Sequence, residues 1–216
     1  MTFSQDRDLV ILEPRLFAEL AWPGQVLAAG SDGALADGAF TSASADFVAA
    51  RLAVGMVLHV QLPAGATALE IVAIDSASEL TVSALRATAD DDAIVPAAEG
   101  ETLSYHVASF AAQAEMVALE MLTSLGLWPA DPTSPWQAQD IAQPEALRAV
   151  SAYGVLATVL GGAASRTDAQ DGYWTKAAHY RRLFERGLQR LRVALGGEGG
   201  SAQAVRDLGA GRLRRD

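Results

Sequence analysis

Apolar residues recur at helical spacing in three stretches of the second half of the chain. The first stretch begins at Ala108, and Gly126 follows it as a residue able to form a left-handed helix cap. The second begins at Pro144, where the fixed φ of proline favours the first helical turn. The third runs from Gly172 to Leu195. Its apolar stripe consists of Tyr173, Ala177, Tyr180, Phe184, Leu188, Leu191 and Leu195. The pattern predicts three long helices.

Between residues 25 and 107 the pattern changes to short alternating or β-branched runs. Turn-forming residues separate them, so several antiparallel strands at close spacing are expected. The predicted strands cover residues 55–62, 67–74, 79–85 and 101–107, with a fifth near 38–43 after a turn at Asp37 and Gly38. A short helix over residues 12–20 precedes this region and is stopped by Trp22, Pro23 and Gly24.

These elements predict an α+β protein. We expect a C-terminal bundle of about three long helices and a short N-terminal helix, with a small antiparallel β-barrel or sandwich inserted between them. The expected division places the N-terminal helix of the helical core in residues 1–24, the inserted β-rich module in 25–107, the helical core in 108–196 and a flexible basic tail in 197–216.

Composition narrows the class of protein. Half of the residues are hydrophobic but only 6% are aromatic, which favours close helix packing. The chain has no cysteine, so disulfides and thiolate metal sites are excluded. The start of the sequence does not resemble a signal peptide, and a cytoplasmic protein is expected. The uncharged stretch Ala149–Ser165 is diluted by Gly, Ser and Thr, which favours a packed helix over a membrane span.

Charge is divided unevenly along the chain. Residues 1–169 have six basic and 21 acidic residues, net −15, whereas residues 170–216 have ten basic and five acidic residues, net +5. The two values sum to the total of −10. Such asymmetry between segments indicates a basic contact face or an interaction tail. Arginine dominates the basic residues, and its planar guanidinium suits protein interfaces and phosphate contacts.

Helical spacing places Arg182, Arg186 and Arg190 on one ridge beside the apolar stripe of the third helix. One interpretation is a solvated outer face whose arginine stems cover apolar surface. The other is an interaction surface, which gains support from a second basic group near the C-terminus, formed by Arg212, Leu213, Arg214 and Arg215 after a Gly-rich link. Direct nucleic-acid binding is the weaker form of this interpretation, since the acidic chain repels phosphates at long range.

The sequence offers no catalytic, cofactor or metal motif. His59, His106 and His179 lie in separate predicted elements, and no HxxxH or HExxH pair, GxSxG elbow or phosphate loop is present. The Gly-rich segment around Asp32 lacks the acidic spacing of a calcium loop and is interpreted as a mobile hairpin or linker. The acidic run Asp90–Asp92 is interpreted as a solvated loop.

The order of elements resembles a known family. A helix "FAAQAEMVALEMLTSLGL" is followed by Trp174, by "AAHYRRLFERGLQRLRVAL", by a Gly-rich link and by a terminal "GRLRR". This order, from Ala108 to Asp216 together with the short N-terminal helix, resembles the head-tail connector, or adaptor, proteins of tailed bacteriophages. The β-rich segment departs from the pattern, because it is larger than the loop that simple helical connectors have there.

The resemblance implies a structural, non-enzymatic virion protein made in the host cytoplasm and located in the virion neck. Such proteins form a ring, commonly of twelve copies, beneath the portal protein, join it to another neck or tail-completion protein and let the genomic DNA pass. Arg212, Leu213, Arg214 and Arg215 would then dock on the portal, and Arg182, Arg186 and Arg190 would contact neighbouring copies or the portal. No cofactor and no membrane are expected.

Two other functions stay open at this point. A binding or regulatory module whose arginine helix contacts nucleic acid would show salt-sensitive DNA binding. An enzyme acting in the β-rich module would need a pocket with convergent polar groups, such as His59 and His106 clustered with an acid.

Overall fold

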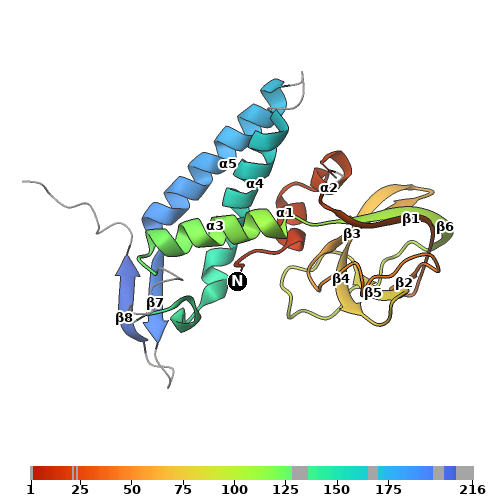
Figure 1. The fold of residues 1–216 in the computed structure, drawn as a ribbon, viewed down its shortest axis with the longest axis horizontal. Coiled ribbons are helices and arrows are strands. Elements are labelled where there is room, and N and C mark those ends of the chain that lie inside the picture. Colours follow the sequence, from red (N-terminus) through yellow and green to blue (C-terminus); the bar gives the residue numbers. More distant parts are fainter. Residues whose placement is uncertain are drawn as a thin grey trace, which may run out of the picture. The chain divides into compact units, whose positions relative to one another are not determined.

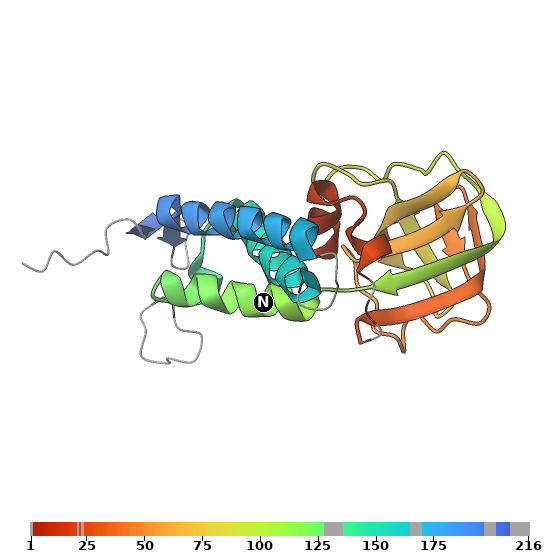
Figure 2. The same cartoon turned by 90° about the horizontal axis from the view of Figure 1, so that it is seen from above.

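The computed structural model describes residues 2–20, 22, 24–127, 136–164, 170–196 and 202–207. The chain forms two compact units, which are drawn in Figures 1 and 2. The residues up to Ser4 belong with those from Ala111 onward in the helical unit, and Gln5–Phe110 form the barrel unit. The predicted α+β class is confirmed, since an antiparallel barrel in the N-terminal half is followed by three helices.

Six antiparallel strands form the barrel and close it. The strands are β1 (Val26–Ala36), β2 (Ala39–Thr41), β3 (Val57–Leu62), β4 (Gly65–Ile74), β5 (Glu79–Ser83) and β6 (Gly100–Ala108). Their order is β1-β2-β5-β4-β3-β6, and β6 pairs with β1 to complete the circle. The five predicted strands correspond to β2 to β6. The turn at Asp37 and Gly38 is confirmed, and both residues have the positive φ that a two-residue hairpin favours.

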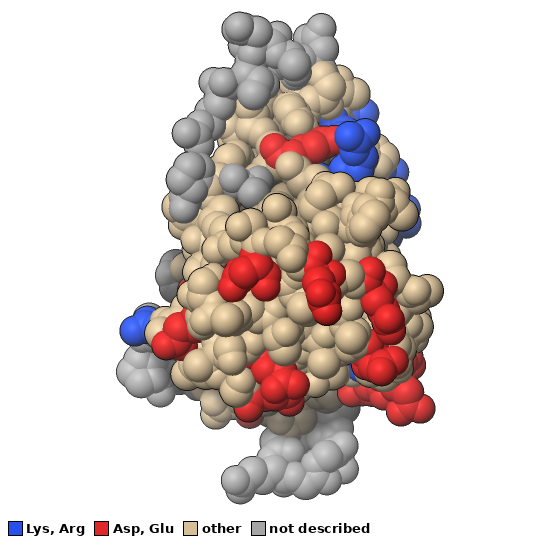
Figure 3. Space-filling model, turned by 90° about the vertical axis from the view of Figure 1, so that its right-hand side faces the viewer, with Lys and Arg blue, Asp and Glu red and all other residues tan. Residues whose placement is uncertain are grey.

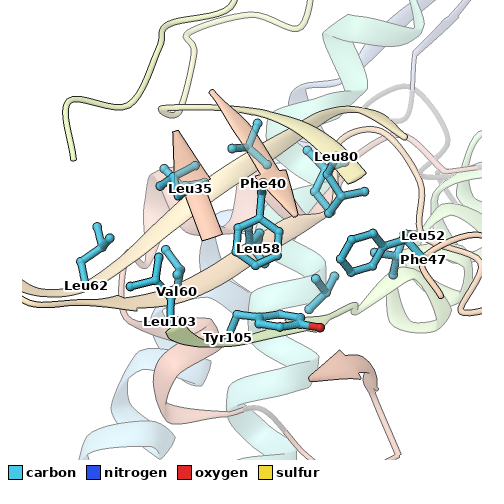
Figure 4. Close-up of a cluster of buried hydrophobic side chains, with 14 residues drawn as sticks. Leu35, Phe40, Phe47, Leu52, Leu58, Val60, Leu62, Leu80, Leu103 and Tyr105 are labelled. Carbon is cyan, nitrogen blue, oxygen red and sulfur yellow. The ribbon is translucent and has the colours of Figure 1, made fainter. Parts of the chain in front are cut away.

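Alternate side chains of each strand fill the barrel interior (Figure 4). Three aromatic rings pack together in this core: Tyr105 meets Phe40 edge to face at 4.9 Å between ring centroids, and Phe47 contacts both. Leucine, valine and isoleucine side chains from the strands surround these rings. The interior is therefore a packed hydrophobic core.

Strand β1 was missed, because its sequence, VLAAGSDGALA, looks like a linker. Its glycines are required by close packing. A Cβ on Gly30 would lie 2.7 Å from the ring of Tyr105, and a Cβ on Gly33 would lie 2.7 Å from the ring of Phe40. The strand is also irregular in register between these two residues. Glycine in a strand often marks such a bulge or close approach. The segment was interpreted as a mobile hairpin or linker; it is not a linker, because it forms β1, the first strand of the β1–β2 hairpin.

The N-terminal segment forms two helices, α1 (Asp6–Leu12) and α2 (Leu16–Glu19). The prediction for residues 12–20 is therefore only partly right, and α1 was not predicted. Both helices belong to the barrel unit, which differs from the expected assignment of residues 1–24 to the helical core. The backbone N–H of Arg7 donates to Gly55 O at 3.0 Å and fixes α1 at the start of β3.

The helical unit is built on α3 (Ala111–Ser124), α4 (Arg148–Ala164) and α5 (Gln170–Arg190), with single 3₁₀ turns at Ala138–Asp140 and Pro144–Leu147. The three predicted helices are thus present. Helix α4 packs against both others. Gly126 has φ +71° and ends α3 as predicted. Helix α4 starts later than predicted because a 3₁₀ turn follows Pro144, and it continues past Gly161 and Gly162 to Ala164.

The third helix ends earlier than predicted, at Arg190 instead of Leu195. The chain then becomes strand β7 (Arg192–Gly196), which pairs antiparallel with β8 (Ala202–Asp207). A bridge from Ile141 to Leu195 holds the other side of β7, and Ala142 N–H donates to Ala194 O at 3.0 Å. The expectation that residues 197–216 form only a flexible tail is therefore wrong for 202–207.

Within the described part of the chain, Pro144–Ala164 is the one segment whose length and composition would let it cross a membrane. In the structure this segment packs against its neighbours. Val155, Leu156 and Leu160 of α4 are almost fully buried. Burial of these side chains agrees with the expectation of a packed core helix.

Two glycines allow the close approach of the helices. A Cβ on Gly154 of α4 would lie 2.6 Å from Val117 of α3 and 2.9 Å from the Phe184 ring of α5. A Cβ on Gly187 of α5 would lie 2.9 Å from Val150 of α4. Glycine lowers the intrinsic stability of a helix, but at a helix crossing it lets the two backbones come close together.

We expect Gly154→Ala to destabilise the protein by about 1 to 3 kcal/mol, because the added methyl overpacks the point where the three helices meet. The matched control is Gly172→Ala in α5, where nothing lies within 4 Å of the added Cβ. That control should be neutral or stabilising by up to about 1 kcal/mol. Urea denaturation followed by circular dichroism measures both, and equal effects would contradict the crossing.

Candidate interaction surface

Helix α5 has a buried side and an arginine side. Ala177, Tyr180 and Phe184 are buried against the rest of the helical unit. The side chains of Arg181, Arg182, Arg186 and Arg190 are exposed. The structure therefore brings the predicted ridge of Arg182, Arg186 and Arg190 together on one solvent-facing side, at spacings of four residues.

The arginines differ in their contacts within the chain. Arg181 forms an ion pair with Glu120 of α3 at 3.5 Å, and its guanidinium lies 5.9 Å from the centre of the Phe184 ring. Arg186 Nε donates to the backbone oxygen of Arg182 at 3.2 Å. Among the described residues, the side chains of Arg182 and Arg190 have no ion-pair partner. The ridge therefore keeps charge available for a partner.

The second predicted site, formed by Arg212, Leu213, Arg214 and Arg215, lies outside the described residues. Its docking role stays a prediction. The last described element before these residues is β8. The basic residues therefore come, in sequence, after a hairpin of the helical unit.

A buried ionic cluster, which sequence reasoning missed, lies in the barrel unit. Glu70 of β4 has no exposed side-chain surface and pairs with two arginines: Arg86 at 2.7 Å and Arg7 of α1 at 3.0 Å. Arg7 also donates to the backbone oxygen of Arg86, and Arg86 donates to Asp91 O at 2.5 Å. The cluster joins α1, β4 and the acidic loop. The cluster is buried from solvent, so we interpret it as a structural link between these three segments.

Asp6 is a second buried acid. Its Oδ1 accepts a hydrogen bond from the backbone N–H of Phe110 at 2.9 Å. Burial raises the pKa of Asp6 from 3.8 to about 6, while hydrogen bonds from Ser109 and Phe110 oppose the shift. The carboxyl connects the start of the barrel unit to its end.

Asp32, in the Gly-rich segment compared above with a calcium loop, already has protein donors. It accepts hydrogen bonds from Ser42 Oγ at 2.8 Å, Ser44 Oγ at 2.9 Å and the Ser44 backbone N–H at 2.9 Å. These donors, the Ser44 N–H above all, lower the pKa of Asp32. Tyr105 donates to Ser42 at 2.8 Å, which extends the network into the core. The carboxylate fastens the bulged strand β1 to the loop after β2.

His59 and His106, expected in separate elements, are direct partners across β3 and β6. Their rings stack at 4.7 Å between centroids, and His106 Nε2 lies 2.9 Å from Phe17 O. Burial, and to a smaller extent His106, lowers the pKa of His59. No acid joins them as a third metal ligand, because the described residues contain no group of three or more His, Cys, Asp or Glu that could hold a metal ion.

The surface of the barrel unit is acidic. Between Gln5 and Phe110 the chain has 15 acidic and four basic residues, net −11. Two of the four basic residues, Arg7 and Arg86, are buried with Glu70. Figure 3 shows acidic side chains spread over the face that it presents, where basic ones are few. The described chain thus has an acidic barrel and an arginine ridge on α5.

Comparison of the chain with protein-family models, curated proteins and solved structures finds no match.

We expect Glu70→Gln to destabilise the protein by about 3 to 5 kcal/mol, because it leaves two buried guanidinium groups without their counter-charge. The control is Glu79→Gln, an exposed acid on β5, for which a change within about 0.5 kcal/mol is expected. Denaturant unfolding measures both. A small effect at Glu70 would show that the cluster does not hold these segments together.

Asp6 should make folding depend on pH. Its folded pKa, about 6, exceeds the ordinary value of 3.8, so the folded state binds the proton more tightly. Stability should therefore rise as pH falls from about 7 to about 4, by about 2 to 3 kcal/mol from this group alone.

The matched variant for this group is Asp6→Asn, which is neutral at every pH. Its stability should exceed that of the natural chain at pH 7, and the difference should shrink towards zero near pH 4. His59 is present in both chains. Its own effect on the pH dependence of stability therefore cancels when their free energies of unfolding are compared at each pH. A difference that stays constant with pH would contradict the assignment.

Proposed function

We propose that this protein is a head-tail connector of a tailed bacteriophage, a structural and non-enzymatic component of the virion neck. In this role it forms a ring under the portal, docks on the portal through its C-terminal end and joins the next neck or tail protein while DNA passes. The observation that carries the proposal is the exposed arginine ridge of α5, followed by a basic C-terminus, in an otherwise acidic chain.

Helix order supports the proposal. The resemblance to connectors rests on Ala108 to Asp216, and three helices and a hairpin occupy the described part of that range. The helical unit also takes in the first residues of the chain, because Ser4 Oγ and Ser151 Oγ of α4 are hydrogen-bonded at 2.8 Å. We therefore interpret the barrel unit as a module inserted into a helical connector core, between Ser4 and Ala111.

The charge distribution also suits a channel protein. An acidic exterior repels DNA phosphates, so a genome in transit would not adhere to it. Basic residues concentrated on one helix and at the C-terminus would serve contacts between proteins. Arginine suits such contacts because it is weakly hydrated and makes paired hydrogen bonds.

Electron microscopy of the protein mixed with the portal protein from the same phage tests the proposal. We expect rings on the portal with the full chain, and loss of docking when the chain is truncated after Asp207. That position keeps β8 and removes Arg212, Leu213, Arg214 and Arg215. A triple Arg212→Ala, Arg214→Ala, Arg215→Ala variant keeps the full length and removes only the three charges. It is the matched control that separates the effect of charge from that of chain length. A full chain that ignores the portal would overturn the proposal.

The nucleic-acid alternative is tested in parallel with duplex DNA at several salt concentrations. A connector should bind free DNA weakly. Affinity that falls steeply with salt and is lost in the Arg182→Ala, Arg186→Ala, Arg190→Ala variant would favour a DNA-binding module instead.

A further inference from the structure

Helix α3 exposes an apolar stripe on the side opposite its core contacts. Ala114, Val117 and Met121 are buried towards α4, whereas Met116 is 67% exposed and Leu119 is 51% exposed. Ala112 is also exposed and lies one turn before Met116, so the three outward residues line up along the helix. A stripe on a surface helix usually faces the protein's own core, and this second stripe faces solvent.

Carboxylates flank the exposed stripe on both sides. Glu115 and Glu120 are exposed next to Met116 and Leu119, and α3 contains no basic residue. This α3 face is defined here as Ala112, Glu115, Met116, Leu119 and Glu120. Apolar positions bordered by charges are the arrangement that helices use when they pack against a partner helix.

The α3 face complements the arginine ridge of α5. From Gly172 to Arg190 the chain has five basic residues and one acidic residue, Glu185. At helical rise the ridge from Arg182 to Arg190 is about 12 Å long, and the α3 face from Ala112 to Leu119 is about 10 Å long. Arginine stems cover apolar surface while their heads reach carboxylates, so the ridge can satisfy both the stripe and its borders.

Charge decides which two faces meet. Packing the α3 face on its own copy would bring glutamates together, and packing the ridge on its own copy would bring arginines together. Of the pairings that these two faces allow, only the cross pairing places opposite charges in contact. The same pairing already occurs within one chain, where Arg181 of α5 and Glu120 of α3 lie 3.5 Å apart.

We propose that the α3 face of one copy receives the α5 arginine ridge of the next copy, which makes a head-to-tail interface of this chain. Such an interface uses two different surfaces, so each copy keeps one free surface for a further neighbour. The proposal rests on the proposed function for its closure into a ring, and it names the two surfaces that the ring would use.

The chain has no cysteine, so engineered thiols report the interface without background. Met116→Cys and Arg186→Cys are made separately, mixed in equal amounts and oxidised gently, without portal. We expect a disulfide-linked dimer joining residues 116 and 186, at about tenfold higher yield than a mixture of Met116→Cys with Ser76→Cys, because proximity raises the effective concentration of the thiols. Ser76 is an exposed residue of the barrel unit. Mass spectrometry identifies the linked peptides.

Two further variants make the outcome decisive. Leu119→Asp, placed in the Met116→Cys chain, should abolish the cross-link while leaving the circular dichroism spectrum unchanged, since the side chain is half exposed. A chain with both cysteines should give a ladder of multimers. Cross-linking of Met116→Cys to itself would show that α3 faces pair with each other, and a yield no higher than that of the Ser76→Cys control would show no interface; either result overturns the proposal.

The failures of the two proposals are distinguishable. The portal-docking experiment tests the C-terminal residues. The cross-linking experiment tests α3 and α5, and it contains no portal. A chain that cross-links between residues 116 and 186 but ignores the portal would keep the interface and lose the connector. A chain that docks on the portal without this cross-link would keep the connector and lose the interface.

Discussion

A carboxylate with no exposed surface has to find its counter-charge inside the protein, and Glu70 finds two. Arg7 comes from the first helix and Arg86 from the segment after β5, so neither charge can be placed until the barrel and α1 have come together. The desolvation of three charges is costly, and the ion pairs offset it only in this geometry. The cluster therefore specifies where α1 lies on the barrel, a position that apolar contacts alone would fix less sharply.

The helical unit depends on a different constraint: the positions where its helices approach most closely must have small side chains or none. Gly154 and Gly187 lie where α3, α4 and α5 approach one another, and alanine occupies many other positions along these helices. Large side chains on the outer sides of these helices, such as Met116 of α3 and Trp174 of α5, are exposed. A core of this kind leaves apolar surface available for contacts with another chain.

The sequence predicted those elements whose burial follows a simple period. Strands β2 to β6 and the three long helices were found, because alternation and helical spacing mark them. Helix α1 was missed because its buried side includes Arg7, a charged residue whose pairing no local pattern reveals. The end of α5 was missed because Leu191 and Leu195 fit both a helix and the alternation of β7, where Val193 and Leu195 are buried. The pairing of His59 with His106 depends on strand register, which composition does not encode. The arginine ridge was predictable, since it needs only the helical repeat.

The hydrogen bond from Phe110 to Asp6 has a mechanical consequence. The barrel unit begins at Gln5 and ends at Phe110, so this bond joins the point where the chain enters the unit to the point where it leaves. A force that pulls the two ends of the unit apart would therefore act on this hydrogen bond. An exchange of the whole unit for a short loop would likewise need only one gap to be bridged.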